Sequence, residues 1–346
     1  MSIQQVDDGA QRDAPSAEGP PNFGIIPGLV WAFRIHVDGT AEPLPFDQPI
    51  ENRPEGWLWI HLNLSSTAAT QWLANSGLPK AGIATMLSRD RHQQLHATNS
   101  FIHGVIADLE QGLDGIGDYV GHLRFIMTDR FLVSGRHRNL AAVETARVAI
   151  ESGGHRLSHA ASLLELIVEQ VADGIDRVAD DLATELDGVE NRIADGLALE
   201  RSQLARVRRT TVRLHRQLSG LRAVFHRLER RGSDDLKPAL QLAASRLAQR
   251  LDDLDHSVLE LRERGRRLQE EMSVMMAEET NRHLYVLSIL TTLLLPPTLI
   301  TGIFGMNTKG LPLTETESGF LIAMGLVIGA SVAVYLLMRR IGVFKL

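Results

Sequence analysis

The sequence predicts an α+β domain followed by long helices and two membrane-spanning helices. Three observations predict this class. Before residue 155, short apolar runs bounded by Gly, Pro or Asp alternate with helical segments. Apolar residues then recur every three or four positions over many turns. Near the C-terminus, residues 284–304 and 319–338 carry no charged side chain, and each run has about the twenty residues that a helix needs to cross a bilayer.

The first part of the chain divides into a leader and a sheet-containing domain. Residues 1–22 are rich in Asp, Gln, Gly and Pro without an apolar core, so we expect a disordered leader and no secretory signal. The domain at 23–155 is expected to hold strands at 28–33, 57–62, 101–106, 123–127 and 131–133, helices at 68–76 and 82–96, and a hairpin turn at 128–130. The clustered Gly112, Gly115, Gly117 and Gly121 lack the spacing of a phosphate-binding loop and are expected to form a plain loop.

Residues 156–283 are expected to form long helices. The segment 163–193 has one apolar face and one acidic face, and the segment 204–230 carries eight arginines. An acidic helix joined to a basic one through 196–199 predicts an antiparallel pair with complementary faces. The alternative is a surface for nucleic acid or anionic lipid. Nucleic acid is disfavoured because Phe225 is the one aromatic residue in the basic segment and the net charge is -6.

A third helix is expected to begin after Ser233 or Asp234, with Pro238 in its first turn, and to continue to Pro296. Some sixty residues at 1.5 Å each give a rod on the order of 90 Å, which would run from the cytoplasm into the membrane. Stepping by three and four traces one polar stripe along it. The stripe passes through Glu270 and Asn281 at the expected cytoplasmic entrance and then through the expected pore-lining residues Leu284, Ser288, Thr291, Leu295 and Thr298.

The hydroxyls of this stripe should point away from lipid, toward helix partners or water. Helix packing through small residues is the alternative explanation. One chain with two spans cannot enclose a pore, whereas several copies around an axis can. The stripe therefore predicts a homo-oligomer in a lipid bilayer.

The first span, 284–307, ends in Gly305, Met306 and Asn307, and the polar turn 308–318 separates it from the second span, 319–338. Asn307 places a neutral amide at the membrane boundary, where amide oxygens can hold a hydrated ion weakly enough to release it. Lys309, Glu315 and Glu317 set the charge of this outer mouth. The tail 339–346 is basic, which predicts that both termini are cytoplasmic and the turn faces outward.

The Gly305-Met306-Asn307 motif, the run 281–288, the turn 308–312 and the two terminal spans resemble the CorA superfamily of divalent-cation transporters, and most closely its zinc-transporting, ZntB-like branch. The resemblance implies a funnel-shaped homopentamer of the bacterial inner membrane. It implies that Gly305, Met306 and Asn307 select the transported ion, which would be Zn²⁺ or else Mg²⁺, Co²⁺, Ni²⁺ or Cd²⁺. The chain departs from the family in the doubled Pro296-Pro297 and in Lys309 just beyond the motif, which leaves ion preference open.

The absence of cysteine excludes thiolate metal sites and leaves His, carboxylate, amide and water as ligands. His92 and His96, and likewise His155 and His159, are spaced to share a helix face and could ligate zinc, although surface or capping roles explain them as well. We expect no resident cofactor and no enzyme activity, because no nucleophile, acid and base constellation occurs. A magnesium or cobalt channel and a non-conducting, membrane-tethered coiled-coil scaffold or sensor remain the alternatives to zinc transport.

Overall fold

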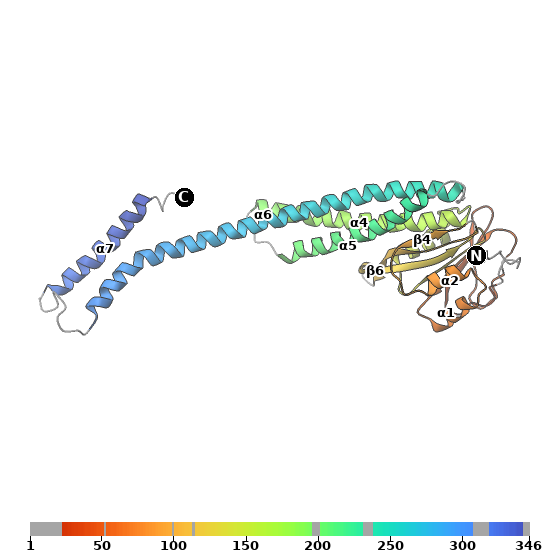
Figure 1. Cartoon of the computed structure of the whole chain (residues 1–346), viewed down its shortest axis with the longest axis horizontal. Helices are drawn as coiled ribbons and strands as arrows, with labels where there is room; N and C mark the ends of the chain where they lie inside the picture. Colours follow the sequence, from red (N-terminus) through yellow and green to blue (C-terminus); the bar gives the residue numbers. More distant parts are fainter. Residues whose placement is uncertain are drawn as a thin grey trace, which may run out of the picture. The chain divides into compact units, whose positions relative to one another are not determined.

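The computed structural model describes residues 23–51, 53–98, 100–112, 115–195, 201–230, 238–306 and 318–341. The chain separates into two compact units, Met1–Arg266 and Arg267–Leu346. The expected leader, residues 1–22, lies outside the described residues. Figure 1 shows the order of the elements along the chain.

A seven-stranded sheet forms the centre of the first unit, in the order β2-β1-β3-β7-β6-β5-β4. Neighbouring strands are antiparallel except β3 and β7, which are parallel. The central strands are nearly continuous apolar runs because helices cover both faces of the sheet. The strands are β1 (Leu29–Ile35), β2 (Ala41–Pro43), β3 (Trp57–Asn63), β4 (Gln94–Ala97), β5 (Ile102–Gly112), β6 (Gly115–Met127) and β7 (Phe131–Arg136).

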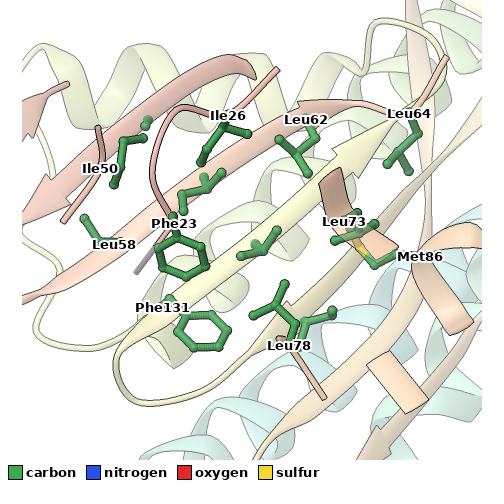
Figure 2. Close-up of a cluster of buried hydrophobic side chains, with 14 residues drawn as sticks. Phe23, Ile26, Ile50, Leu58, Leu62, Leu64, Leu73, Leu78, Met86 and Phe131 are labelled. Carbon is green, nitrogen blue, oxygen red and sulfur yellow. The ribbon is translucent and has the colours of Figure 1, made fainter. Parts of the chain in front are cut away.

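Helices α1 (Thr67–Ala74) and α2 (Lys80–Leu87) cover one face of this sheet (Figure 1). Figure 2 shows their side chains, among them Leu73 and Met86, packed with Leu62 and Phe131 of the strands in one buried cluster. Gly82 permits this approach, since a Cβ there would lie 2.8 Å from Ile126 of β6. The other face is covered by α3 (Ala141–Glu151) and the first part of α4 (Ala160–Ala194).

The strands predicted from the sequence are confirmed, and so is the hairpin turn at 128–130, which joins antiparallel β6 and β7. The helix predicted at 82–96 is wrong after Leu87. Ser88 and Asp90 accept hydrogen bonds from the backbone N–H groups of Asp90 and His92, a local pattern that competes with helix formation, and the chain then enters β4.

Two further predictions are corrected. Gly112, Gly115 and Gly121 do not form a loop, because β5 and β6 continue through them as one long hairpin with Gly112 opposite Gly115. His155 and His159 do not share a helix face, since α3 ends at Glu151 and His159 is the residue before α4. The sequence analysis also missed α3, β2 and β4. The signal for α3 was present in Ala142, Val143, Ala146 and Ile150, which are buried at helical spacing.

The first unit also contains an up-down-up bundle of α4, α5 (Arg201–Glu229) and the first part of α6 (Pro238–Phe304). Helix α4 is antiparallel to α5, as predicted, with Arg206 near the start of α5 paired to Glu185 near the end of α4 at 2.7 Å. Pro238 is the first residue of α6, also as predicted.

The ion pairs between α4 and α5, which the sequence predicts, are only some of the ion pairs in the bundle. Three arginines of α6 pair with the acidic face of α4: Arg246 with Glu165, Arg250 with Asp176, and Arg264 with Asp187. Arginine and histidine side chains of α5 in turn contact acidic residues of α6, such as Arg222 with Asp252 at 2.6 Å. Helix α6 therefore pairs with the acidic face of α4 and with the basic face of α5. The prediction from the sequence paired these two faces only with each other.

One of these contacts predicts a pH dependence. His226 Nε2 lies 3.0 Å from Asp252 Oδ1, and this hydrogen bond raises the pKa of His226 above 6.5. A raised folded-state pKa contributes stability that is complete below the unfolded pKa and is lost as the pH rises through the folded pKa. We therefore expect His226→Gln to lower the thermal midpoint of the first unit more at a pH of about 6 than at about 9.

The matched control is His256→Gln, because His256 is exposed on α6 and bonds only its own helix backbone at Asp252 O. Scanning fluorimetry at the two pH values measures the difference. An equal loss for His226→Gln at both values would show that the charged His226–Asp252 contact adds no stability.

Candidate functional site

Two helices of the chain are long and apolar enough to cross a membrane: the C-terminal part of α6 and α7 (Gly319–Ile341). None of the most apolar window of either helix is buried in the structure. A core helix of a soluble protein would be largely covered, so exposure of two such helices at the C-terminal end favours membrane insertion.

The predicted stripe lies on the open side of α6. Ser288, Thr291, Leu295 and Thr298 are all exposed. The half-buried positions of the same segment are residues 285, 289, 293, 296, 297, 300 and 304. At about 100° per residue, these positions lie roughly opposite the stripe on the helix surface. The stripe therefore lies opposite the half-buried positions of this segment.

The threonines of this segment bond their own backbone. Thr291 Oγ1 donates to Leu287 O at 2.8 Å, and Thr298 Oγ1 donates to Leu294 O at 2.7 Å. Such bonds satisfy the hydroxyl hydrogens and leave the oxygens as acceptors on the exposed surface. A row of acceptors can hydrogen-bond the water shell of a passing cation.

Helix α6 continues through Pro296 and Pro297. Because proline has no N–H group, the carbonyls of Thr292 and Leu293 lack their usual helical donors. These carbonyls add two acceptors in the middle of the span. The sequence analysis noted the doubled proline but not the carbonyls four residues before it, which that spacing could have revealed.

The backbone is closely packed at the end of the first span. Helix α6 ends at Phe304, Gly305 N–H donates to Thr301 O at 2.9 Å, and a Cβ on Gly305 would lie 3.0 Å from that oxygen. Met306 follows with its side chain 55% exposed. Asn307, Lys309, Glu315 and Glu317 lie outside the described residues, so their roles stay predictions.

At the expected cytoplasmic entrance, Glu270 and Asn281 are exposed on α6 within the second unit. Both fall on the helical face that continues into the stripe. The structure thus presents these two side chains and the stripe along one line of the same helix.

The proposed histidine pair is not arranged as predicted. His92 lies in the segment after α2, where its Nδ1 is 2.6 Å from Asp90 Oδ1, whereas His96 lies in β4 and stacks on His103 at 5.1 Å. The helix that would have placed the two rings on one face ends at Leu87. In the described part of the chain, no three His, Cys, Asp or Glu side chains cluster in a way that could hold a metal ion.

With this geometry in view, the family model for CorA-like Mg²⁺ transporter proteins matches residues 54–340. The match covers strands β3 to β7 of the sheet, the long helices and both apolar helices, and it begins after β1 and β2. The chain belongs to the CorA-like family. The resemblance seen in the motif and the two spans is thereby confirmed, and the family consists of transporters rather than enzymes.

Curated relatives include proteins named zinc transport protein ZntB. The protein from Pectobacterium carotovorum is 27% identical over 301 residues, which cover 85% of this chain and 89% of that protein. The protein from Yersinia enterocolitica is 29% identical over 271 residues, which cover 76% and 80%.

Solved structures share the fold. The full-length CmaX protein superposes with a TM-score of 0.75 at 24% identity, over 93% of this chain and 99% of that one. The CorA magnesium transporter from Methanocaldococcus jannaschii gives 0.72 at 19% identity, over 90% and 97%. These likenesses support the predicted α+β domain, long helices and two terminal helices as one fold.

Proposed function

We propose that this protein moves hydrated divalent cations, zinc first among them, through a central pore lined by the α6 helices of several copies. The observation that carries the proposal is the exposed stripe of Ser288, Thr291 and Thr298, which lies opposite the half-buried positions of the same helix. In a membrane, such a face is expected to meet other helices or water.

Zinc is proposed because the curated relatives across most of the chain are named zinc transport proteins. A magnesium or cobalt channel is the second candidate, favoured by the description of the family model. We further propose a homopentamer in the inner membrane with both termini in the cytoplasm, as the CorA resemblance implies. Asn307 would form the selecting ring, and Glu270 and Asn281 would meet the ion at the cytoplasmic end.

The mostly neutral lining of this pathway is suited to weak binding of a hydrated ion. Apart from Glu270, the polar groups of the proposed lining are hydroxyls and amides rather than carboxylates or thiolates. Neutral oxygen ligands bind the water shell of a divalent ion without stripping it, and conduction requires weak binding at several sites.

Flux measurement tests the proposal. The full chain is reconstituted in liposomes, and uptake of radioactive zinc, magnesium and cobalt is compared with and without a pH gradient. We expect zinc uptake well above that of empty liposomes, from a particle well above the 38.2 kDa of one chain. A monomer in native-like lipid, or an oligomer that passes no divalent ion, would contradict the pore and favour the scaffold alternative.

The outer turn supplies a further prediction. Glu315 and Glu317 should concentrate cations electrostatically, so Glu315→Gln with Glu317→Gln should reduce zinc uptake more at low than at high ionic strength. The reason is that salt at about 0.1 M screens charges beyond about 10 Å. Lys309→Ala should raise uptake under the same low-salt conditions.

Initial uptake rates at several salt concentrations measure the effect, and Glu263→Gln on the exposed surface of the first unit serves as the control. If apparent zinc affinity is unchanged in both outer-turn variants at every salt concentration, these charges are ordinary solvated surface and selection lies in the motif and the stripe.

A further inference from the structure

A buried arginine lies on the α1–α2 face of the sheet without a carboxylate partner. Arg124 of β6 is only 4% exposed and stands between Val105 of β5 and Gly135 of β7. Its Nη2 donates to the backbone carbonyl of Asp90 at 2.7 Å, and its Nε has no hydrogen-bond partner. Among the described residues, no carboxylate lies within ion-pair distance of Arg124, although the nearby Asp90 carboxylate attracts it and partly offsets the lowering of its pKa by burial and by Arg91.

The side chains around Arg124 are also basic. His122 lies two residues earlier on β6 and therefore on the same face. Arg91, in the segment that crosses this face after α2, and His137, just after β7, complete the group. Burial and the positive charges of Arg124 and Arg91 lower the pKa of His122 and of His137. A hydrogen bond to the backbone of Arg91 and the charge of Glu110 act in the opposite direction on the pKa of His122.

Two acidic residues lie nearby but are engaged elsewhere. The exposed Asp90 carboxylate accepts hydrogen bonds from the backbone and ring of His92. Glu110 is paired with Arg138 at 3.1 Å. Asp90 still attracts Arg124, and Glu110 still attracts His122. We name Arg91, His122, Arg124 and His137 the cationic cluster: four basic side chains beside two carboxylates that are each bonded to another residue.

Burial of such a group is unfavourable unless a negative charge accompanies it. Arginine stays protonated in proteins, so Arg124 cannot escape by losing its proton. Buried charges are found with counter-charges, and like charges converge only at a cost. A purely structural role explains the bond of Arg124 to Asp90 O and the bond of His122 to the backbone of Arg91. It does not explain why two arginines and two histidines converge at one place. A metal cation is disfavoured because two guanidinium groups would repel it.

We propose that the cationic cluster binds a small tetrahedral oxyanion, either free phosphate or sulfate or the phosphoryl group of a small metabolite. The planar guanidinium fork matches oxygens of this kind. Arg124 would hold the anion from inside the sheet, while the exposed Arg91 and His137 would close over it from two different segments. This site is distinct from the α6 stripe, and it stands whether or not the transport proposal does.

Binding can be measured on the full chain in detergent. All four tryptophans, Trp31, Trp57, Trp59 and Trp72, belong to the sheet and α1, so their fluorescence reports unfolding of this unit. The thermal midpoint is recorded against inorganic phosphate at constant ionic strength, and separately against glycerol phosphate. Site binding raises the stability in proportion to ln(1 + L/Kd), where L is the free phosphate concentration. Phosphate also stabilises proteins by exclusion from their surface, an effect that does not saturate and is common to all variants.

The decisive comparison uses exposed residues, so that folding is retained. We expect Arg91→Gln with His137→Gln to weaken phosphate binding about tenfold or more, since each lost charge-assisted hydrogen bond has an effect of that order. Arg89→Gln, an exposed arginine of the same segment outside the cluster, should bind within about twofold of wild type, as an unrelated surface change should.

Calorimetric titration of the same three proteins provides the affinities. Stronger binding of glycerol phosphate than of inorganic phosphate would identify a phosphorylated metabolite as the ligand, and the reverse would identify the free anion. An identical phosphate response in wild type and in the Arg91 and His137 double variant overturns the proposal. Absence of saturable binding to the wild type overturns it as well.

Discussion

We expect Asn307→Ala to abolish most divalent-cation flux while expression and oligomer size stay as in wild type. If a ring of Asn307 amides bonds the water shell of the entering ion, alanine removes every one of those contacts at once because each copy carries the change. The residue follows the helix end at Phe304 and the turn at Gly305 and Met306. Asn307 itself lies outside the described residues, and in the loop predicted from the sequence its side chain has little packing to lose.

Initial rates of zinc uptake into liposomes measure this effect, with size-exclusion chromatography of the same preparation to check assembly. Thr308→Ala is the matched control, because it removes a polar side chain from the next position of the turn without touching the motif. Wild-type flux from correctly inserted Asn307→Ala would assign selection to another part of the pathway.

The largest effect on stability is expected at Asp255. This carboxylate is 2% exposed on α6, accepts from His215 Nδ1 at 2.9 Å and contacts Nη1 of Arg222, so it joins α5 to α6. Removing one partner of a buried ion pair is destabilising because the remaining charge loses compensation. Here His215 would lose its carboxylate, whereas Arg222 would keep its second partner, Asp252. We expect Asp255→Ala to lower the free energy of unfolding by about 3 kcal/mol, at the low end of the usual range because both partners are 30% exposed.

Tryptophan fluorescence during thermal unfolding of the full chain reads this change, since all four tryptophans belong to the same compact unit. Asp253→Ala is the matched control: Asp253 carries the same charge on the same helix but is exposed. A midpoint shift for Asp255→Ala no larger than that for Asp253→Ala would mean that the α5–α6 contact depends on apolar packing alone.

The local sequence was sufficient to predict the strands and the long helices. Trp57–Asn63 and Phe131–Arg136 are apolar runs that have few alternatives to a doubly covered strand, and the acidic and basic helices carry their apolar residues at helical spacing. The prediction of a helix through His96 failed because side-chain bonds of Ser88 and Asp90 to the backbone ended α2 early. Composition does not reveal such short-range bonds.

The residues of the candidate pathway could also be predicted from the sequence, and the reason is physical. A spanning helix meets lipid on most sides, so any row of hydroxyls on it is already unusual before the structure is known. Ser288, Thr291 and Thr298 could therefore be selected by spacing alone. Spacing could not say which positions of α6 are exposed. The structure shows that the stripe is exposed and that the half-buried positions lie opposite it, which leaves the hydroxyls open to further copies.

By itself, the sequence determined the two spans, the motif after the first span, the helical and strand periodicities and the family, because each depends on neighbours in the chain. Only the tertiary structure decided how charges separated by tens of residues meet. It assigned the acidic face of α4 to arginines of α6 as well as α5, and it gathered Arg91, His122, Arg124 and His137 on one face of the sheet. Coulomb interactions depend on distance in space, and the sequence alone supplies only distance along the chain.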